Sequence, residues 1–391
     1  MLSIIETLGW LSGIQKWITL FEYNLEDKSR FQRYFLGVLR RLPIIYINIY
    51  SIYDIIKISQ GELTFISFDS VTSEAVSAID LVVFKIVSIL ILIYFTIYQR
   101  KHIQIVREIT NFEKKWCYIL QDVSKKRRRA RFIYFFQFLF LFLFNFSYNI
   151  FFYFKIEEYM GRHLSLIIWY FALVCQSANI DFVALYLVGY INVFAMNLDI
   201  IHLKRFTDEE KLVVFKFLPQ YFDAFKRIDS LFGIIIFIIL MCRLVEATTY
   251  SCLVLLFSYE LTLNQAEFVG LFAICCAMWV FGNILIMLHI ASCGESIQSK
   301  EVSMFIKLAA LHIDDKNRTK LKDCINFGVK TFLLKHLHEP KAIIIGRFVH
   351  INYKFMFSTL SVLVANMAIF IQFCQYEASY QEMAIEEKLE R

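Results

Sequence analysis

Apolar residues in this chain gather into long runs that are separated by polar segments. A helix that crosses a membrane needs about 20 consecutive, mainly apolar residues. Runs of that length occur seven times, so the pattern predicts an all-α membrane protein with seven transmembrane helices. The predicted spans are residues 34–57, 80–98, 132–154, 164–196, 231–257, 268–292 and 349–374.

The polar segments on one side of the predicted spans also carry a helical pattern. In residues 213–232 (VVFKFLPQYFDAFKRIDSLF), apolar and charged positions alternate at helical spacing. Stretches of this kind commonly continue a span into water and pack against one another there. We therefore expect a helical anchor region below the membrane. For the basic run in residues 124–131 (SKKRRRAR), contact with anionic lipid headgroups is an equally open alternative.

Charge sets the expected orientation, because loops rich in Lys and Arg stay in the cytoplasm. The N-terminal segment and the second, fourth and sixth loops hold 31 Lys and Arg residues, against four on the opposite side. The N-terminus is therefore predicted to be cytoplasmic and the C-terminus extracellular. This is opposite to the orientation of receptors that couple to G proteins.

Composition agrees with a polytopic membrane protein. Of the 391 residues, 58% are hydrophobic and only 19% are charged, which is too few charges to cover a soluble protein of this size. Three prolines and twelve glycines favour long, uninterrupted helices. The first residues lack a basic region and a cleavage site, so we expect the first span to act as the internal signal.

The last predicted span has two unlike faces. At about 100° per residue, its small and polar residues fall within an arc of about 80°, and its bulky residues lie opposite. The small stripe consists of Ser358, Ser361, Ala365, Ala368 and Gln372. Two interpretations stay open: a tight interface between helices, or the weakly polar wall of a pore that ends in an amide. Phe373 beside Gln372 would then supply an apolar constriction.

The same helix resembles a known family. Insect gustatory receptors have this length, seven helices with the N-terminus inside, and a motif of Thr-Tyr, five apolar residues and Gln-Phe in the last helix. Here Gln372-Phe373 and the five apolar residues match, while Ala365-Asn366 stands in place of Thr-Tyr. The preceding stretch, residues 332–348, looks like the short helix that comes before the pore helix of the family. Topology covers the whole chain, and the motif covers about its last 45 residues.

The resemblance implies a ligand-gated, non-selective cation channel in the plasma membrane of chemosensory neurons. It implies a tetramer around the last helix, with possible related subunits, and a gate at Gln372 and Phe373. The implied parts are a sensor and anchor region (residues 1–348), a pore-lining helix (residues 349–374) and an acidic extracellular tail (residues 375–391). Because the Thr-Tyr pair is not kept, a bitter or otherwise aversive tastant is a better expectation than a sugar.

The orientation also defines the outer halves of the spans, where a ligand would enter. Aromatic residues with a few polar anchors there suit a mostly apolar small molecule. The predicted ligand-binding residues are Tyr148, Asn149, Trp169, Tyr170, Gln176, Glu246, Thr249, Tyr250 and Trp279. A carboxylate inside a span, such as that of Glu246, has either a ligand or a partner, and Arg243 is at the right spacing for an ion pair. Lys85 has no partner that the sequence identifies.

No catalytic, cofactor or nucleic-acid signature is found, so an enzyme is not expected. His336 and His338 are two residues apart and would point to different faces of a helix, so no metal site is predicted either. Two other functions stay open beside the channel. They are a multi-pass transporter of small molecules and a metabotropic signalling receptor.

Overall fold

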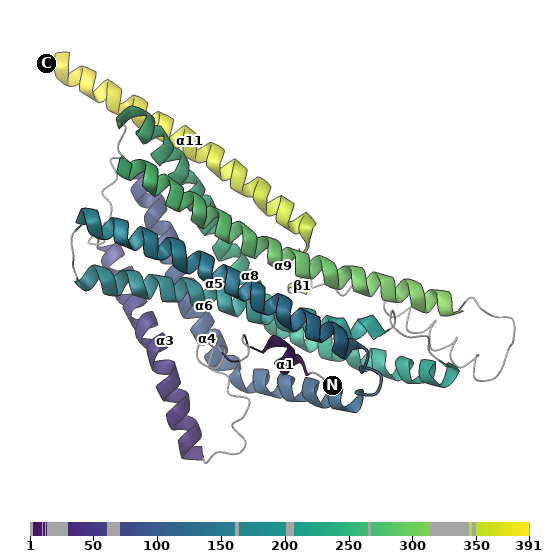
Figure 1. Ribbon diagram of the computed structural model, residues 1–391. Coiled ribbons are helices and arrows are strands. Elements are labelled where there is room, and N and C mark those ends of the chain that lie inside the picture. The colour runs from purple at the N-terminus through teal and green to yellow at the C-terminus, as the bar shows by residue number, and fades with distance from the viewer. Residues whose placement is uncertain are drawn as a thin grey trace.

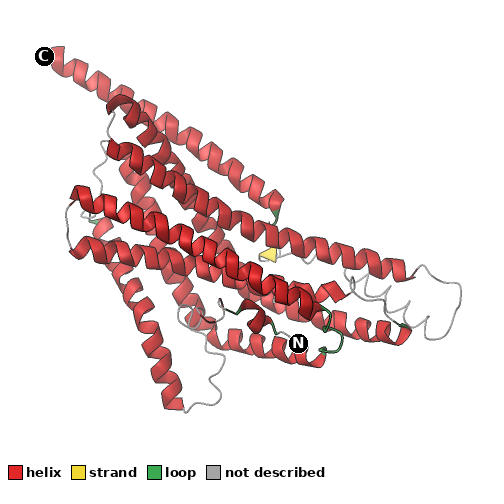
Figure 2. Ribbon diagram, viewed as in Figure 1, coloured by secondary structure: helices red, strands yellow, loops and turns green. Residues whose placement is uncertain are grey.

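The computed structural model of the chain describes residues 3–9, 11, 13, 30–60, 71–160, 164–200, 207–264, 267–312, 344–345 and 349–390. Within these residues the fold is helical, apart from one small antiparallel pair of strands (Figure 2). The elements are α1 (Ile4–Leu8), α3 (Arg30–Ser59), α4 (Val71–Lys115), α5 (Val123–Met160), α6 (Leu164–Ala195), the 3₁₀ helix η2 (Met196–Asp199), α8 (Asp208–Asn264), α9 (Glu267–His312), β1 (Ile344–Ile345), β2 (Val349–His350) and α11 (Tyr353–Glu390).

The long helices form one elongated bundle (Figure 1). Helices α8 and α9 pack along each other, and α8 also contacts α4, α6 and α11. Helix α5 packs on α6, and α3 packs on α4 and α6. Helices α3 and α11 consequently lie at opposite edges of the bundle.

Five helices contain a stretch that is long and apolar enough to cross a membrane. They are Leu81–Lys115, Phe171–Asp199, Val213–Leu256, Ala273–Lys307 and Tyr353–Tyr376. These stretches overlap the second, fourth, fifth, sixth and seventh predicted spans. The first and third predicted spans lie within α3 and α5, where part of the side chains fall outside the described residues. The all-helical fold is confirmed, while the total of seven spans and the orientation stay predictions.

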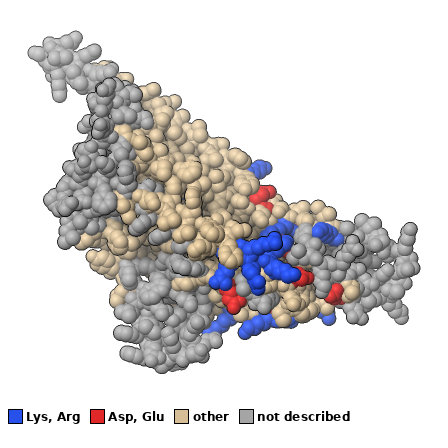
Figure 3. Space-filling view, viewed as in Figure 1, with Lys and Arg blue, Asp and Glu red and all other residues tan. Residues whose placement is uncertain are grey.

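Several helices continue well past the predicted spans. Helix α8 begins at Asp208, about 34 Å of helix before the span predicted from residue 231. The amphipathic stretch 213–232 is helical, as its pattern predicts. In the view of Figure 3, the described Lys and Arg residues gather around the end of α4 and the start of α5. The described surface nearer the C-terminus shows almost none.

The best-packed core lies at this charged end of the bundle. It joins the second halves of α4, α6 and α9 to the first half of α8, with many side chains fully buried. Aromatic rings form much of it: Phe194 stacks on Tyr221 at a centroid distance of 4.8 Å, and Phe112 lies 5.2 Å from Phe217. The amphipathic extensions therefore pack on one another, as expected for an anchor region.

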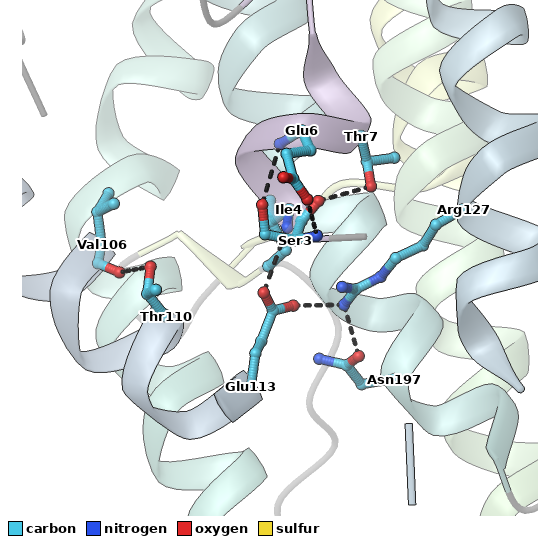
Figure 4. A network of polar contacts seen from close by, with 9 residues as sticks. All are labelled: Ser3, Ile4, Glu6, Thr7, Val106, Thr110, Glu113, Arg127 and Asn197. Carbon is cyan, nitrogen blue, oxygen red and sulfur yellow. Dashed lines mark hydrogen bonds and ion pairs between the residues drawn. The ribbon is translucent and has the colours of Figure 1, made fainter. Parts of the chain in front are cut away.

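A short N-terminal helix, α1, is docked into this end (Figure 4). Ser3 caps it, since its hydroxyl accepts from the Glu6 amide while the Glu6 carboxylate accepts from the Ser3 amide. The Glu113 carboxylate of α4 accepts a further hydrogen bond, at 3.2 Å, from the amide of Ile4. The side chains of Ile4, Thr7 and Leu8 are buried as a result.

The basic run at the start of α5 divides into two parts. Arg127 is fully buried, pairs with Glu113 at 2.5 Å and donates a 2.7 Å hydrogen bond to the Asn197 side chain (Figure 4). Lys125, Arg128 and Arg129 are exposed. Internal packing therefore explains Arg127, whereas the side chains of Lys125, Arg128 and Arg129 are available to other partners.

Helix α11 differs in extent from the predicted span of residues 349–374. It begins at Tyr353, because Val349–His350 pairs with Ile344–Ile345 and the Asn352 side chain caps the helix by accepting from the Phe355 amide at 3.0 Å. It continues to Glu390, since no Gly or Pro interrupts the residues after 374. Residues 344–345 are a strand and not part of the expected short helix, most of which lies outside the described residues.

Candidate functional site

Helix α11 packs on its own chain through one face. Met356, Thr359, Leu363 and Phe370 are buried against α8 and α9, and they recur at the three- and four-residue spacing of a single helix face. Of the most apolar 18-residue part of each helix, 17% is buried in α11, against 61% in α6 and in α8. Most of α11 therefore faces away from the bundle.

The predicted stripe of small and polar residues lies on the side of α11 that is turned away. Ser358, Ser361, Ala365, Ala368 and Gln372 are all exposed. At about 100° per residue, the centre of this stripe is about 170° from the centre of the packed face. The stripe is therefore not an interface between helices of the same chain.

The predicted gate residues are also exposed in the single chain. Gln372 and Phe373 lie near the middle of α11, and Phe373 is 59% exposed. Asn366, which replaces the Tyr of the family motif, is exposed as well. The structure thus brings all the predicted pore residues to one free surface, without supplying a partner for it.

The start of α11 is held tightly to α9. A Cβ atom built on Gly294 would lie 1.7 Å from the carbonyl oxygen of Ile351, so the backbones touch at a distance that only glycine permits. One turn further along α9, Gln298 accepts a 3.4 Å hydrogen bond from the Asn352 side chain. The segment that leads into α11 is therefore fixed to the bundle, and the helix that follows packs on α8 and α9 through its one buried face.

A buried ion cluster lies in the middle of the bundle, centred on Arg243 of α8. Its guanidinium group pairs with Glu246 one turn away and with Asp181 of α6, each at 2.5 Å. It also donates to the Asn283 side chain of α9 at 3.2 Å and to the Ser177 carbonyl at 3.3 Å. The predicted pair between Arg243 and Glu246 is thus present within α8. The cluster around it joins three helices, α6, α8 and α9.

A second buried cluster joins α3, α4 and α6. Lys85, which had no predicted partner, pairs with Asp54 of α3, and both side chains are almost fully buried. On the next turn of α3, the Ser51 hydroxyl accepts a hydrogen bond from the Gln176 amide, and the Ile47 carbonyl accepts another at 3.2 Å. Gln176 and Ser177 are adjacent, so α6 connects the two clusters.

The remaining predicted ligand-binding residues are only partly described. Tyr250 of α8 and Trp279 of α9 stack at a centroid distance of 4.9 Å. Thr249, which precedes Tyr250 in the chain, is buried. This aromatic pair lies one helical turn beyond Glu246. The side chains of Tyr148, Asn149, Trp169 and Tyr170 fall outside the described residues.

Sequence reasoning missed Asp54, Asp181 and Asn283 as members of the buried clusters. The signal was present for the two carboxylates, because both Asp residues lie inside predicted spans, where an ionised side chain normally has a partner. What the sequence does not contain is the identity of that partner, since the pairs connect different helices.

With this geometry described, the chain was compared with known proteins. A profile of the family described as 7tm Chemosensory receptor matches residues 7–377. The solved structure of the insect olfactory receptor OR5 from Machilis hrabei superimposes with a TM-score of 0.55, covering 95% of this chain and 99% of that chain. The two sequences are 11% identical, so this likeness concerns the fold. A search of curated proteins gives no match.

The family profile extends over almost the whole chain. It therefore covers the bundle of α3 to α9 as well as most of the last helix, on which the resemblance to gustatory receptors was based. The resemblance is confirmed at the level of the family, and so is the expectation that the protein is not an enzyme. The chain belongs to the seven-transmembrane chemosensory receptor family, which comprises the gustatory and olfactory receptors of insects.

Proposed function

We propose that this protein is a gustatory receptor that acts as a ligand-gated, non-selective cation channel of the plasma membrane. Members of its family are ligand-gated cation channels. The observation that carries the proposal for this chain is the orientation of α11: its small and polar stripe faces away from the helices of its own subunit.

A stripe of this kind needs a partner other than lipid. Hydrocarbon cannot hydrogen-bond an exposed amide such as that of Gln372, so a lipid-facing position would leave the amide unsatisfied. Ser361, Ala365 and Ala368 also offer too little apolar surface to favour lipid contact. Four copies of α11 around one axis would turn the stripe toward water, with small side chains allowing close approach of the helices.

The gate of the proposed pore lies at the outer end of this stripe. Gln372 would form a ring of amides, and Phe373, about 100° further around the helix, would form an apolar constriction between neighbouring copies. In this arrangement the Ala365-Asn366 pair lies one to two turns below the gate. The acidic residues after 374 would attract cations toward the outer mouth.

The proposed ligand site lies in the outer half of each subunit, around the stacked pair of Tyr250 and Trp279. Aromatic side chains of this kind bind flat, mainly apolar molecules. Glu246 already pairs with Arg243, which it shares with Asp181, so a positively charged ligand is not required to give that carboxylate a partner. A bitter or aversive compound fits these features better than a sugar, which would need more paired polar groups.

Recording from cells that lack other channels tests the proposed activity. We expect a panel of bitter compounds to evoke cation current without any added G protein. Saturable uptake of a compound without current would instead identify a transporter, and current that requires a G protein would identify a metabotropic receptor.

Cysteine accessibility tests the pore wall directly. In a background from which reactive cysteines have been removed, Ser361→Cys and Ala368→Cys should react with a water-borne thiol reagent and block the current. Leu363→Cys, on the packed face, is the matched control and should stay unreactive. Protection of Ser361→Cys and Ala368→Cys in both open and closed states would contradict a water-filled pore along this stripe.

A further inference from the structure

The outward face of α5 changes from charged to apolar within one turn. Lys125, Arg128 and Arg129 are exposed, and the exposed apolar side chains that follow lie on the same side of the helix. The apolar residues are Phe132, Phe136, Phe140 and Leu143, each at least half exposed. At about 100° per residue, all seven positions fall within an arc of about 120°.

The opposite side of α5 faces the interior over residues 123–134. Val123, Arg127, Ala130 and Tyr134 are buried and recur every three or four residues. The outward face is therefore a continuous surface that no other described element covers. The third predicted span begins at residue 132, so we expect this apolar part to contact lipid chains and the basic residues before it to lie where the lipid headgroups begin.

The spacing along the helix agrees with this position. Arg129 precedes Phe132 by about 4.5 Å of helix, and Lys125 precedes it by about 10 Å. The headgroup layer on each side of the hydrocarbon core is about 5–8 Å thick. Arg128 and Arg129 thus lie within that layer, and the long side chain of Lys125 reaches back to it.

Nearby carboxylates do not neutralise this face. Glu113 pairs with the buried Arg127, and Asp199 pairs with Lys126 at 3.2 Å. In the part of the chain that the structure describes, no ion pair joins Lys125, Arg128 or Arg129 to a carboxylate. Figure 3 shows the resulting cluster of Lys and Arg over the start of α5, next to the uncharged surface.

We propose that Lys125, Arg128 and Arg129 form a binding site for anionic phospholipid headgroups, in the leaflet that borders the basic loops. Phosphate and carboxylate groups of the lipid supply the negative charge that the protein does not provide at this face. Binding there holds the start of α5 at a fixed depth in the membrane, next to the buried pair of Arg127 and Glu113. The proposal does not depend on channel activity.

Native mass spectrometry of the full-length protein tests it, with equal amounts of phosphatidylserine and phosphatidylcholine as the probe lipids. We expect phosphatidylserine to be retained preferentially. Each basic residue near an anionic surface strengthens binding about fivefold, so Arg128→Gln combined with Arg129→Gln should weaken phosphatidylserine binding by about tenfold or more. Equal retention of both lipids by the native protein would overturn the proposal.

A matched variant separates a local site from the overall charge. Lys216→Gln combined with Lys226→Gln removes two exposed charges from the cytoplasmic extension of α8 and should change phosphatidylserine binding less than about twofold. An equal loss in both double variants would contradict a site on α5.

A measurement on the native protein alone covers the case in which the α5 variant does not fold. Raising the salt concentration from about 0.1 M to about 1 M shortens the Debye length from about 10 Å to about 3 Å. The preference for phosphatidylserine over phosphatidylcholine should fall accordingly. A preference that does not depend on salt would exclude headgroup charge as its cause.

Discussion

The carbonyl oxygen of Ile351 fills the space that a side chain on Gly294 would need, at 1.7 Å from the expected Cβ position. No flexible side-chain end is involved in this contact, because the oxygen belongs to the backbone. Any larger residue at position 294 must therefore push the segment leading into α11 away from α9. Together with the packed face of α11, this contact attaches the last helix to the bundle.

Replacing Gly294 with Ala should destabilise the protein by about 1–3 kcal/mol, the usual cost of overpacking a well-packed site. The apparent melting temperature of the purified protein in detergent measures the effect. Gly189→Ala is the control, because its added methyl would come closest to the flexible end of the Leu8 side chain, at 3.1 Å, and would touch the Tyr134 ring only at an ordinary contact distance of 3.7 Å. Equal stability of the two variants would show that the contact at Ile351 is not a constraint.

Removing Arg243 should be among the most damaging changes in the bundle. Arg243→Met leaves Asp181 and Glu246 buried without their common cation, and breaking a buried pair in this way costs about 3–5 kcal/mol. Adding Asp181→Asn and Glu246→Gln to that variant should restore part of the stability. The same thermal measurement applies.

Arg227 provides the comparison for Arg243. It pairs with Glu108 at a similar distance, 2.7 Å, but its side chain is 58% exposed. Arg227→Met should therefore cost less than about 1 kcal/mol. A loss in Arg243→Met no greater than that in Arg227→Met would mean that burial does not strengthen the cluster's contribution.

The pair of Lys85 and Asp54 can be tested by exchanging its charges. Lys85→Asp and Asp54→Lys should each destabilise the protein, because each places two like charges together in a buried site. The double exchange should recover stability, with a coupling energy of about 0.5–3 kcal/mol in a double-mutant cycle. Additive losses would indicate that the two side chains do not interact in the membrane.

Substitution of Gln372 tests the proposed gate. Gln372→Ala removes the amide that the proposal places toward the pore, so conductance, block or open probability should change in single-channel records. Gln375→Ala is the control, because this exposed glutamine lies about 60° to one side of Gln372 on the helix. Unchanged permeation and gating in Gln372→Ala would contradict a gate at this position.

The docking of α1 should depend on Glu113. Glu113→Ala removes the acceptor of the Ile4 amide and leaves Arg127 without its ion pair, so hydrogen exchange in residues 3–9 should accelerate by about tenfold or more. Hydrogen-exchange mass spectrometry measures this directly. The matched substitution Glu108→Ala, at an exposed site on the same helix, should leave exchange in residues 3–9 unchanged.

Local pattern was sufficient to predict most of the helical framework and one ion pair. The apolar runs identified the helices, and the spacing of three residues identified Arg243 with Glu246. The start of α11 was placed too early because Val349 and Ile351 extend the apolar run. The pairing of Val349–His350 with Ile344–Ile345 depends on a turn of chain that periodicity does not describe.

The contacts between helices could not be read from the sequence. Lys85 finds Asp54 on a neighbouring helix, 31 residues away, and Asp181 finds Arg243 after 62 residues of intervening chain. Pattern shows that a charge inside a span needs a partner, but tertiary packing decides which one it meets. The same limit applies to α11: its small and polar stripe was visible in the sequence, while the face through which it packs on α8 and α9 was not.

The two buried clusters also impose an order on biogenesis. In both clusters the carboxylate emerges from the ribosome before its cation: Asp54 precedes Lys85 by 31 residues, and Asp181 precedes Arg243 by 62 residues. Helices α3 and α6 therefore gain these ion pairs only after α4 and α8, respectively, have been synthesised. The longer delay falls on α6, so truncation before residue 243 should expose α6 to membrane quality control.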